Sequence, residues 1–266
     1  MTKKNRNELI KLYNHAVNMS RLSGDYIKQN INANLDIDFK GRADMVTQVD
    51  KKSEEIIRNK INEKYPDHQI LAEESGNKNT DSKFKWIIDP LDGTTNFVHG
   101  YNFVSVSIAL EYEGEIVLGI VNCPSEGELF TAIKNEGAYL NGKRIEVSEV
   151  ASLENSLLAT GFPYDLNDVF YKNMKLFQKF YESSQGVRRG GSAAMDLCYV
   201  ACGRFDGFWE YDLNPWDIAA GSLIVREAGG KLSNNSGEKY SIYADPVIAS
   251  NKHLSNSIEQ VISDIS

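Results

Sequence analysis

The chain of 266 residues carries 37 acidic and 29 basic side chains, a formal net charge of −8. This balance argues against a general nucleic-acid or membrane-surface binder, although bound metal ions can give an acidic protein an anion site. No apolar run is long enough to span a bilayer, and no signal peptide is expected at the start. Three cysteines are too few for a disulfide framework, so we expect a cytoplasmic globular protein.

The first part of the chain alternates helices and short strands. Amphipathic helices are predicted over residues 7–20 and 49–65, because apolar residues recur there at helical spacing. Short strands are predicted at 69–74 and 86–89. The polar segment 75–85 between them is expected to be a flexible loop.

The middle of the chain has the pattern of strands. Residues 104–112 alternate between apolar and small or polar side chains, which predicts a half-buried strand. Glu113–Gly114, Gly137 and Asn141–Gly142 are turn signals. Together they predict an antiparallel meander and exclude a repeated strand–helix–strand unit here.

The second half returns to a mixture of elements. A strand is predicted within 153–162, and helices are predicted over 168–183 and 191–203. A further helix follows Asn214, which is placed as its N-cap, with Pro215 at the first helical position and Gly229 at its C-terminal end. Since strands and helices both occur in blocks, the fold class expected is α+β, in layers.

Carboxylates gather at the ends of these predicted elements. Asp89 and Asp92 follow an apolar run, Glu73 and Glu74 end the strand before it, and Asp217 is the third residue of a helix. Nearby anions repel each other, so a cation is expected among them. Oxygen ligands of this kind suit two or three Mg²⁺ ions.

A phosphate site is predicted beside these acids. Pro90 stiffens the turn between the two aspartates, and Gly93 permits close approach of the backbone. Thr94 and Thr95 then open a helix, whose free N–H groups can bind an anion. Carboxylates for metal next to amides for phosphate suggest metal-assisted hydrolysis of a phosphate ester.

Each of these signals is weak when taken alone. An Asp-x-x-Asp pair is common in turns, Glu73–Glu74 alone is more often a solvated loop, and Asp217 can simply satisfy a helix N-terminus. The spacing also differs from the Asp-x-Asp-x-Thr of haloacid-dehalogenase phosphatases. The four histidines are scattered, so no zinc site is expected, and only His99, shortly after Thr94 and Thr95, is a candidate to line a site.

Two longer motifs carry a specific resemblance. The stretches WIIDPLDGTTNFVHG and NPWDIAAGSLIVREAGG resemble the two signatures of the inositol monophosphatase family, the lithium-sensitive, magnesium-dependent phosphatases. The resemblance extends from DMVTQVD through ILAEES and RRGGSAAMDLC to ADPVIASN. It implies an α-β-α-β-α sandwich of the inositol monophosphatase and fructose-1,6-bisphosphatase type. It also implies one domain over 1–266, with a metal-site half (1–150) and a substrate half (151–266), commonly as a homodimer.

The resemblance also implies a role for each site residue. Glu73, Asp89 and the carbonyl of Leu91 would hold the first Mg²⁺. Asp89, Asp92 and Asp217 would hold the second, and Glu73 with waters a weaker third. Thr94, oriented by Asp50, would activate the attacking water together with Glu73 and the first ion. The substrate-binding set would be Asp92, Asp217, the backbone of Gly93 and Thr94, and the ring contacts Gly191, Ser192, Ala193 and Glu210.

Two positions depart from the family pattern, and the motifs allow more than one substrate. Lys40, which matches the family lysine near the third ion, stands one residue closer to ADMV than in the family, and Ser192 replaces a common threonine. The motif DGTTNF favours the inositol phosphatase branch over the phosphoadenosine branch. NADP and fructose 1,6-bisphosphate are alternative substrates, and a non-catalytic metal- or phosphate-binding regulator is a more distant alternative.

Overall fold

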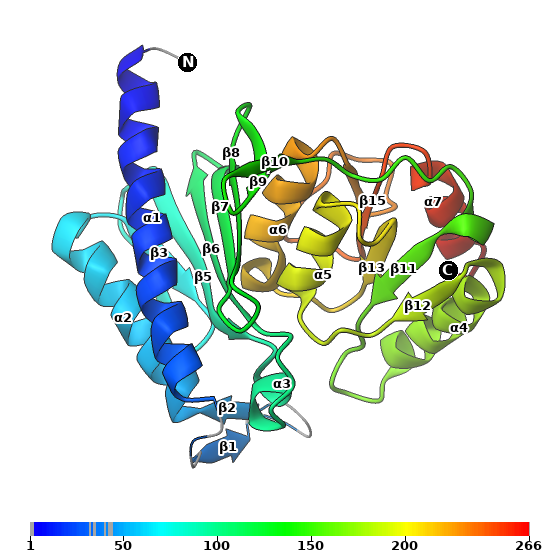
Figure 1. Cartoon of the computed structure of the whole chain (residues 1–266), viewed down its shortest axis with the longest axis horizontal. Helices are drawn as coiled ribbons and strands as arrows, with labels where there is room; N and C mark the ends of the chain where they lie inside the picture. Colours follow the sequence, from blue (N-terminus) through cyan, green and yellow to red (C-terminus); the bar gives the residue numbers. More distant parts are fainter. Residues whose placement is uncertain (1–2, 32, 34–35, 40, 42–44, 266) are drawn as a thin grey trace.

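The computed structural model describes residues 3–31, 33, 36–39, 41 and 45–265, and these residues form five layers (Figure 1). An eight-stranded and a five-stranded sheet are the second and fourth layers. Helices form the other layers in pairs, namely α1 (Lys3–Gln29) with α2 (Gln48–Lys64), α5 (Ala193–Ala201) with α6 (Pro215–Glu227), and α4 (Asp168–Ser183) with α7 (Ser255–Ile265). The expected α-β-α-β-α arrangement is therefore confirmed.

The larger sheet contains the predicted meander. Its strands lie in the order β10 (Lys143–Ile145), β9 (Gly137–Leu140), β8 (Glu128–Ile133), β7 (Glu115–Cys123), β6 (Ser105–Tyr112), β5 (Phe84–Asp92), β3 (Gln69–Ala72) and β4 (Gly76–Lys78). All neighbours are antiparallel except β3 and β5, which run parallel. The carboxyl ends of β3 and β5 thus lie at the same edge of the sheet.

The prediction of a flexible loop over 75–85 was wrong in part. Gly76–Lys78 turn back on β3 as β4, and β5 already begins at Phe84. The polar side chains that suggested a loop are also typical of a short edge strand, where charged and polar residues discourage pairing with another chain. Polarity alone could not distinguish the two.

The smaller sheet lies in the C-terminal half. Its order is β12 (Gly186–Arg188), β11 (Leu157–Thr160), β13 (Gly207–Glu210), β15 (Val247–Ser250) and β14 (Lys231–Ser233). Only β11 was predicted, after the short 3₁₀ helix η1 (Leu153–Asn155), because three- and four-residue strands show too little periodicity. Helix α7 and the hairpin of β1 (Ile37–Phe39) with β2 (Met45–Thr47) were not predicted either.

The other predicted elements are present, α4 with the predicted ends and most of the others with shifted ends. Helix α1 extends the predicted 7–20 in both directions, and the predicted strand 86–89 is the centre of β5. Helix α6 begins after Asn214 with Pro215 in its first turn. Its C-cap is Ala228, followed by Gly229 at φ +87°, the left-handed conformation that glycine adopts most easily. None of the helices in the described ranges is long and apolar enough to cross a membrane.

The middle helices are buried on every side. In α6 each residue from Ile218 to Val225 is buried, since the helix lies between the two sheets. The contact with the larger sheet is close at Gly119 in β7, where a Cβ atom would lie 2.6 Å from the carbonyl oxygen of Ala220. This glycine lets the backbones of β7 and α6 approach, which brings the start of α6 near the ends of β3 and β5.

We predict that Gly119→Ala lowers the free energy of unfolding by about 1–3 kcal/mol, the usual cost of overpacking a core. The new methyl group would meet a backbone oxygen of α6 that has no rotamer to change. Gly119→Val should cost more, and urea denaturation with melting temperatures measures both. Equal stability of all three proteins would mean that α6 can move away from β7 without cost.

Candidate active site

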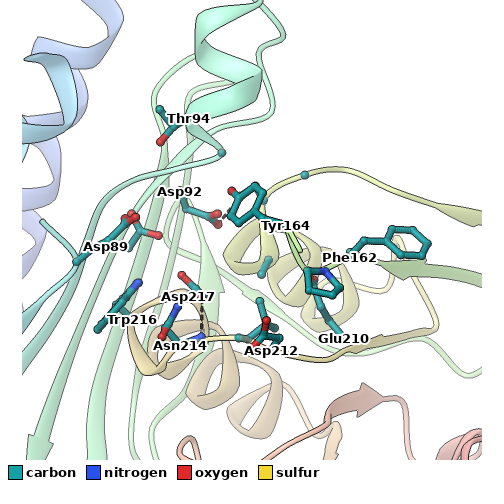
Figure 2. Close-up of a pocket in the computed structure, with 18 of the residues that line it drawn as sticks. Asp89, Asp92, Thr94, Phe162, Tyr164, Glu210, Asp212, Asn214, Trp216 and Asp217 are labelled. Carbon is teal, nitrogen blue, oxygen red and sulfur yellow. Dashed lines mark hydrogen bonds between the residues drawn. The ribbon is translucent and has the colours of Figure 1, made fainter. Parts of the chain in front are cut away.

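A cleft of about 360 Å³ is lined by residues from both sheets and from the two helices between them (Figure 2). The residues that line it come from the ends of β3 and β5, the starts of α3 (Thr94–Val98), α5 and α6, the end of β13, and the segment 161–165. These elements lie far apart in the sequence. The layered fold brings their ends to one place.

A β-bulge puts Asp89 and Asp92 on the same side of β5. Side chains alternate along a strand, so residues three apart normally point to opposite faces. Asp89 pairs with Ser107 of β6, whereas Asp92 pairs with Ser105, which gives β5 one extra residue between the two pairs. The extra residue restores a common face. Pro90, which has no N–H to give to the ladder, stands inside this bulge.

Glu73 reaches the same place from β3. The parallel pairing places Ala72 opposite Ile88, and the N–H of Glu73 lies 3.3 Å from the carbonyl oxygen of Ile88. The next residues on the two strands, Glu73 and Asp89, are therefore neighbours. Adjacent parallel strands thus bring their terminal acids together.

Asp92 is held by the N-terminus of α5. Its Oδ2 atom accepts hydrogen bonds from the hydroxyl of Ser192 at 2.6 Å and from the N–H of Ala194 at 2.8 Å. Ser192 also caps α5, because its Oγ accepts from the N–H of Met195. Ser192 was expected to contact a substrate ring. Its hydroxyl instead donates its proton to Asp92.

Asp89 and Asp217 each accept a backbone hydrogen bond through one carboxylate oxygen. The Oδ1 atom of Asp89 accepts from the N–H of Leu91 at 2.9 Å. The Oδ2 atom of Asp217 accepts from the N–H of Asn214 at 2.7 Å, which caps the start of α6. These bonds fix the direction of each carboxylate, and Figure 2 shows Asp89, Asp92 and Asp217 around a common space.

The cleft concentrates negative charge. Its described lining contains eight acidic side chains and one basic side chain, Arg189. Burial raises the pKa of Asp89 well above its usual value, and the charges of Glu73, Asp92 and Asp217 raise it further. Burial also raises the pKa of Asp92 to about 6, although hydrogen bonds from Ser192 and Ala194 oppose the shift. Such repulsion is relieved when a cation binds.

The donor set fits a hard cation with an incomplete protein shell. In the part of the chain that the structure describes, no three carboxylate, imidazole or thiol groups stand together closely enough to hold one ion. Mg²⁺ usually takes only one or two carboxylates and keeps waters or substrate phosphate as its other ligands. The all-oxygen lining therefore suits Mg²⁺ better than a closed zinc site.

Thr94, at the edge of the cleft, and Asp50, behind it, form a hydrogen-bonded pair. The hydroxyl of Thr94 lies 2.7 Å from Oδ1 of Asp50 and 3.1 Å from the carbonyl oxygen of Leu91. Because a hydroxyl has one proton, the shorter contact with the carboxylate takes it. Asp50 is fully buried, and its Oδ2 accepts from the N–H and the hydroxyl of Thr47. Burial raises the pKa of Asp50, and the bonds from Thr47 and Thr94 lower it.

The remaining predicted residues lie at the end of β13 and at or just before the starts of α3 and α5. Glu210 ends β13, is buried, and packs against Gly161 so closely that a Cβ there would overlap its carboxylate. Burial raises the pKa of Glu210 to about 8, and Arg189 opposes the shift. Gly93 and Gly191 both have positive φ, and their backbones lie close together. A Cβ on Gly93 would be 3.2 Å from the carbonyl oxygen of Gly191.

Some lining residues were not predicted. The segment 161–165, Arg189 and Asp212 belong to the cleft, as does Asp196, whose Oδ1 is buried without a hydrogen-bond partner in the described residues. An acid in the apolar run AAMDLCYVA was a signal that could have identified Asp196. By contrast, Glu74 and His99 are not among the lining residues described, and Lys40 lies outside the described residues.

The chain has clear relatives. The model of the inositol monophosphatase family matches residues 8–266. Inositol-1-monophosphatase from Synechocystis sp. is 47% identical over 228 residues, 85% of this chain and 79% of that protein. Nus factor SuhB from Escherichia coli K12 is 42% identical over 246 residues, 91% and 92% of the two chains. The solved structure of extragenic suppressor protein suhB from Bartonella henselae is 40% identical, covers 95% of this chain and 98% of that one, and has a TM-score of 0.91. This chain therefore belongs to the inositol monophosphatase family, whose phosphatase members act on small phosphate esters and generally depend on metal ions.

Proposed function

We propose that this protein is a Mg²⁺-dependent phosphomonoesterase whose substrate is an inositol monophosphate. The observation that carries the proposal is the contact of Thr94 with Asp50 beside a cluster of buried acids. A regulator that only bound metal or phosphate would have no need of this hydroxyl–carboxylate pair. The name of the Synechocystis relative supports the choice of inositol monophosphate.

Four acids and one carbonyl would hold the metal ions. Glu73, Asp89 and the carbonyl of Leu91 are assigned to a first Mg²⁺, and Asp89, Asp92 and Asp217 to a second. Binding of the second ion would require these three carboxylates to move closer together. Glu73 would also contribute to a third. When bound, the ions polarise the phosphate oxygens, make a water molecule acidic at neutral pH, and stabilise the leaving oxygen.

The chain's own part in the reaction is to orient the water and remove its proton. The Thr94 hydroxyl donates to Asp50, so its lone pairs are available to accept a proton from the attacking water. As that proton arrives, the hydroxyl proton can pass to Asp50. The backbone of Gly93 and Thr94 would bind the phosphate, and no side chain caps the helix end at Gly93 in the described residues.

The rest of the substrate would lie toward the second sheet. Glu210 is assigned to its hydroxyl groups, together with the backbone of Gly191 and Ala193. Ser192 would act through Asp92, because its hydroxyl donates to that carboxylate. Asp92 and Asp217 would serve the substrate as well as the metal, since both border the same cleft.

The protein would work as one domain in the cytoplasm. The metal half (1–150) and the substrate half (151–266) face one cleft, which supports a single unit. The free thiols of Cys123, Cys198 and Cys202 are consistent with a reducing compartment. We also expect a homodimer, to be tested by light scattering, and inhibition by Li⁺ at the second metal position near Asp92 and Asp217.

The decisive test is phosphate release from a panel of metabolites, with and without Mg²⁺. The panel should include inositol 1-phosphate, NADP and fructose 1,6-bisphosphate. Preference for inositol 1-phosphate supports the proposal, and preference for either of the others assigns this site to that substrate. No release from any compound would favour the alternative of a non-catalytic metal- or phosphate-binding regulator.

We predict that EDTA abolishes activity and that added Mg²⁺ restores it. Asp89→Asn should remove most of the activity, because Asp89 is assigned to two ions and the amide is a weaker ligand than the carboxylate. Steady-state assays and calorimetric titration with Mg²⁺ measure both effects. Asp81→Asn, an exposed aspartate away from the cleft, is the matched control. Full activity of the native protein in EDTA would refute the metal mechanism.

We predict that Thr94→Val lowers kcat by about 10²–10⁴, the usual value of general acid–base assistance. Asp50→Asn should lower kcat similarly, and the double variant should lose little more, because the two groups act as one unit. The variants should differ in stability, since only Asp50 also caps α2 through Thr47. Kinetics, Mg²⁺ affinity and melting temperatures separate these effects, and fully additive losses in kcat would exclude the relay.

We predict that Glu210→Gln changes the preference among substrates and leaves Mg²⁺ affinity unchanged. Glu210 ends β13 and lines the cleft, but it is not among the acids assigned to the metal ions. The measurement is kcat/KM for inositol 1-phosphate and for p-nitrophenyl phosphate, which has no hydroxyl groups on its ring. A loss of the same size on both compounds would show that Glu210 does not set specificity.

A further inference from the structure

Helix α2 presents three buried polar side chains to the site. Asp50, Ser53 and Glu54 are 0%, 0% and 3% exposed, and their spacing of three and four residues puts them on one face. Asp50 contacts Thr94, as described above. Buried polar groups are costly unless they are hydrogen-bonded, so the partners of the other two matter.

Ser53 holds the bulge of β5. Its hydroxyl donates to the carbonyl oxygen of Pro90 at 2.7 Å. The hydroxyl of Ser23 in α1 lies 2.5 Å from Oγ of Ser53 and donates to it, since the proton of Ser53 is already used. The bulge leaves Pro90 outside the pairing of β5 with β6, and α2 supplies the partner that the sheet does not.

Glu54 holds the turn that follows β3. Its Oε2 atom accepts from the N–H of Glu74 at 2.8 Å, and its Oε1 atom accepts from the N–H of Ser75 at 3.1 Å and from the Ser75 hydroxyl. The guanidinium of Arg58 lies 3.9 Å away on the same helix. A buried carboxylate with three donors makes a stronger attachment than neutral groups would.

We propose that Glu54 is a positioning residue for the first metal site. It binds the two amides directly after Glu73, and so it sets where the chain leaves β3 and where the carboxylate of Glu73 points. Glu54 lies on the far side of the turn and is not among the residues that line the cleft. The inference rests on the proposed function, because it requires that Glu73 binds a metal ion.

A glutamine cannot replace this carboxylate. Its amide has one acceptor oxygen, whereas the turn offers donors to both oxygens of Glu54. Its NH₂ group would face at least one N–H of the turn, and that buried donor would be left without a partner. The turn must then shift, and Glu73 shifts with it.

The test measures Mg²⁺ binding directly by calorimetric titration and by the rise in melting temperature with Mg²⁺. Glu54→Gln should weaken Mg²⁺ binding about 10- to 100-fold, the usual effect of removing a group that orients a metal ligand. The Mg²⁺ concentration needed for half-maximal activity should rise in proportion, while kcat at saturating Mg²⁺ stays near the native value. A purely structural role would lower the melting temperature without this split.

Two further variants serve as a control and as a second test. Glu55→Gln changes the neighbouring exposed glutamate, which pairs with Lys52, and should leave Mg²⁺ binding unchanged. Ser75→Ala removes one of the three bonds to Glu54 and should weaken binding less than Glu54→Gln; it decides the question if Glu54→Gln does not fold. Native Mg²⁺ affinity in Glu54→Gln and in Ser75→Ala would overturn the inference, whereas failure of the native protein to bind Mg²⁺ would overturn the proposed function itself.

Discussion

Alternation of side chains along a strand is the constraint that the site has to overcome. Asp89 and Asp92 are three residues apart, so a regular β5 would send one of them into the layer beneath α1 and α2. Leu91 packs there instead, in the same cluster as Ile88. The bulge around Pro90 turns Asp92 back to the side of Asp89. The common orientation of Asp89 and Asp92 toward the cleft depends on this single irregularity in the ladder.

Crowded acids require fixed geometry as well as a counter-charge. Backbone amides supply the geometry, because Asp92 accepts from the start of α5 and Asp217 from the start of α6. Unpaired amides at helix N-termini favour a negative group, so these bonds also stabilise the ionised carboxylates. The repulsion between Asp89 and its neighbours remains, and a cation in the cleft is the group that would relieve it.

The middle layer links the two halves of the site. Helices α5 and α6 pack against both sheets, and each brings its N-terminus to the cleft. A substrate held against Glu210 and a metal held by Asp89 would therefore share one rigid support. A fold alone does not define function, and family members bear names as different as inositol-1-monophosphatase and Nus factor SuhB. The contact between Thr94 and Asp50 is the observation that supports hydrolysis as the function of this chain.

The sequence by itself determined the elements with strong local signals. The α6 start at Asn214 and Pro215, the left-handed Gly229 and the meander from Ser105 to Ile145 follow from capping, turn chemistry and periodicity. The motifs also indicated that Glu73, Asp89, Asp92 and Asp217 belong to one site. Strands as short as β12 and β14 were missed, because three residues carry no readable period and are stabilised by their neighbours in the sheet.

Only the tertiary structure decided how the acids are held. Nothing local in the sequence indicates that Ser192 donates to Asp92, or that Glu54 binds the turn after β3, since the partners lie 100 and 20 residues apart. The position of Asp196 in the cleft likewise depends on contacts between segments that are distant in the sequence. Hydrogen bonds between distant segments depend on which strands pair and which helices cover them, and that choice is made by burial of the whole core.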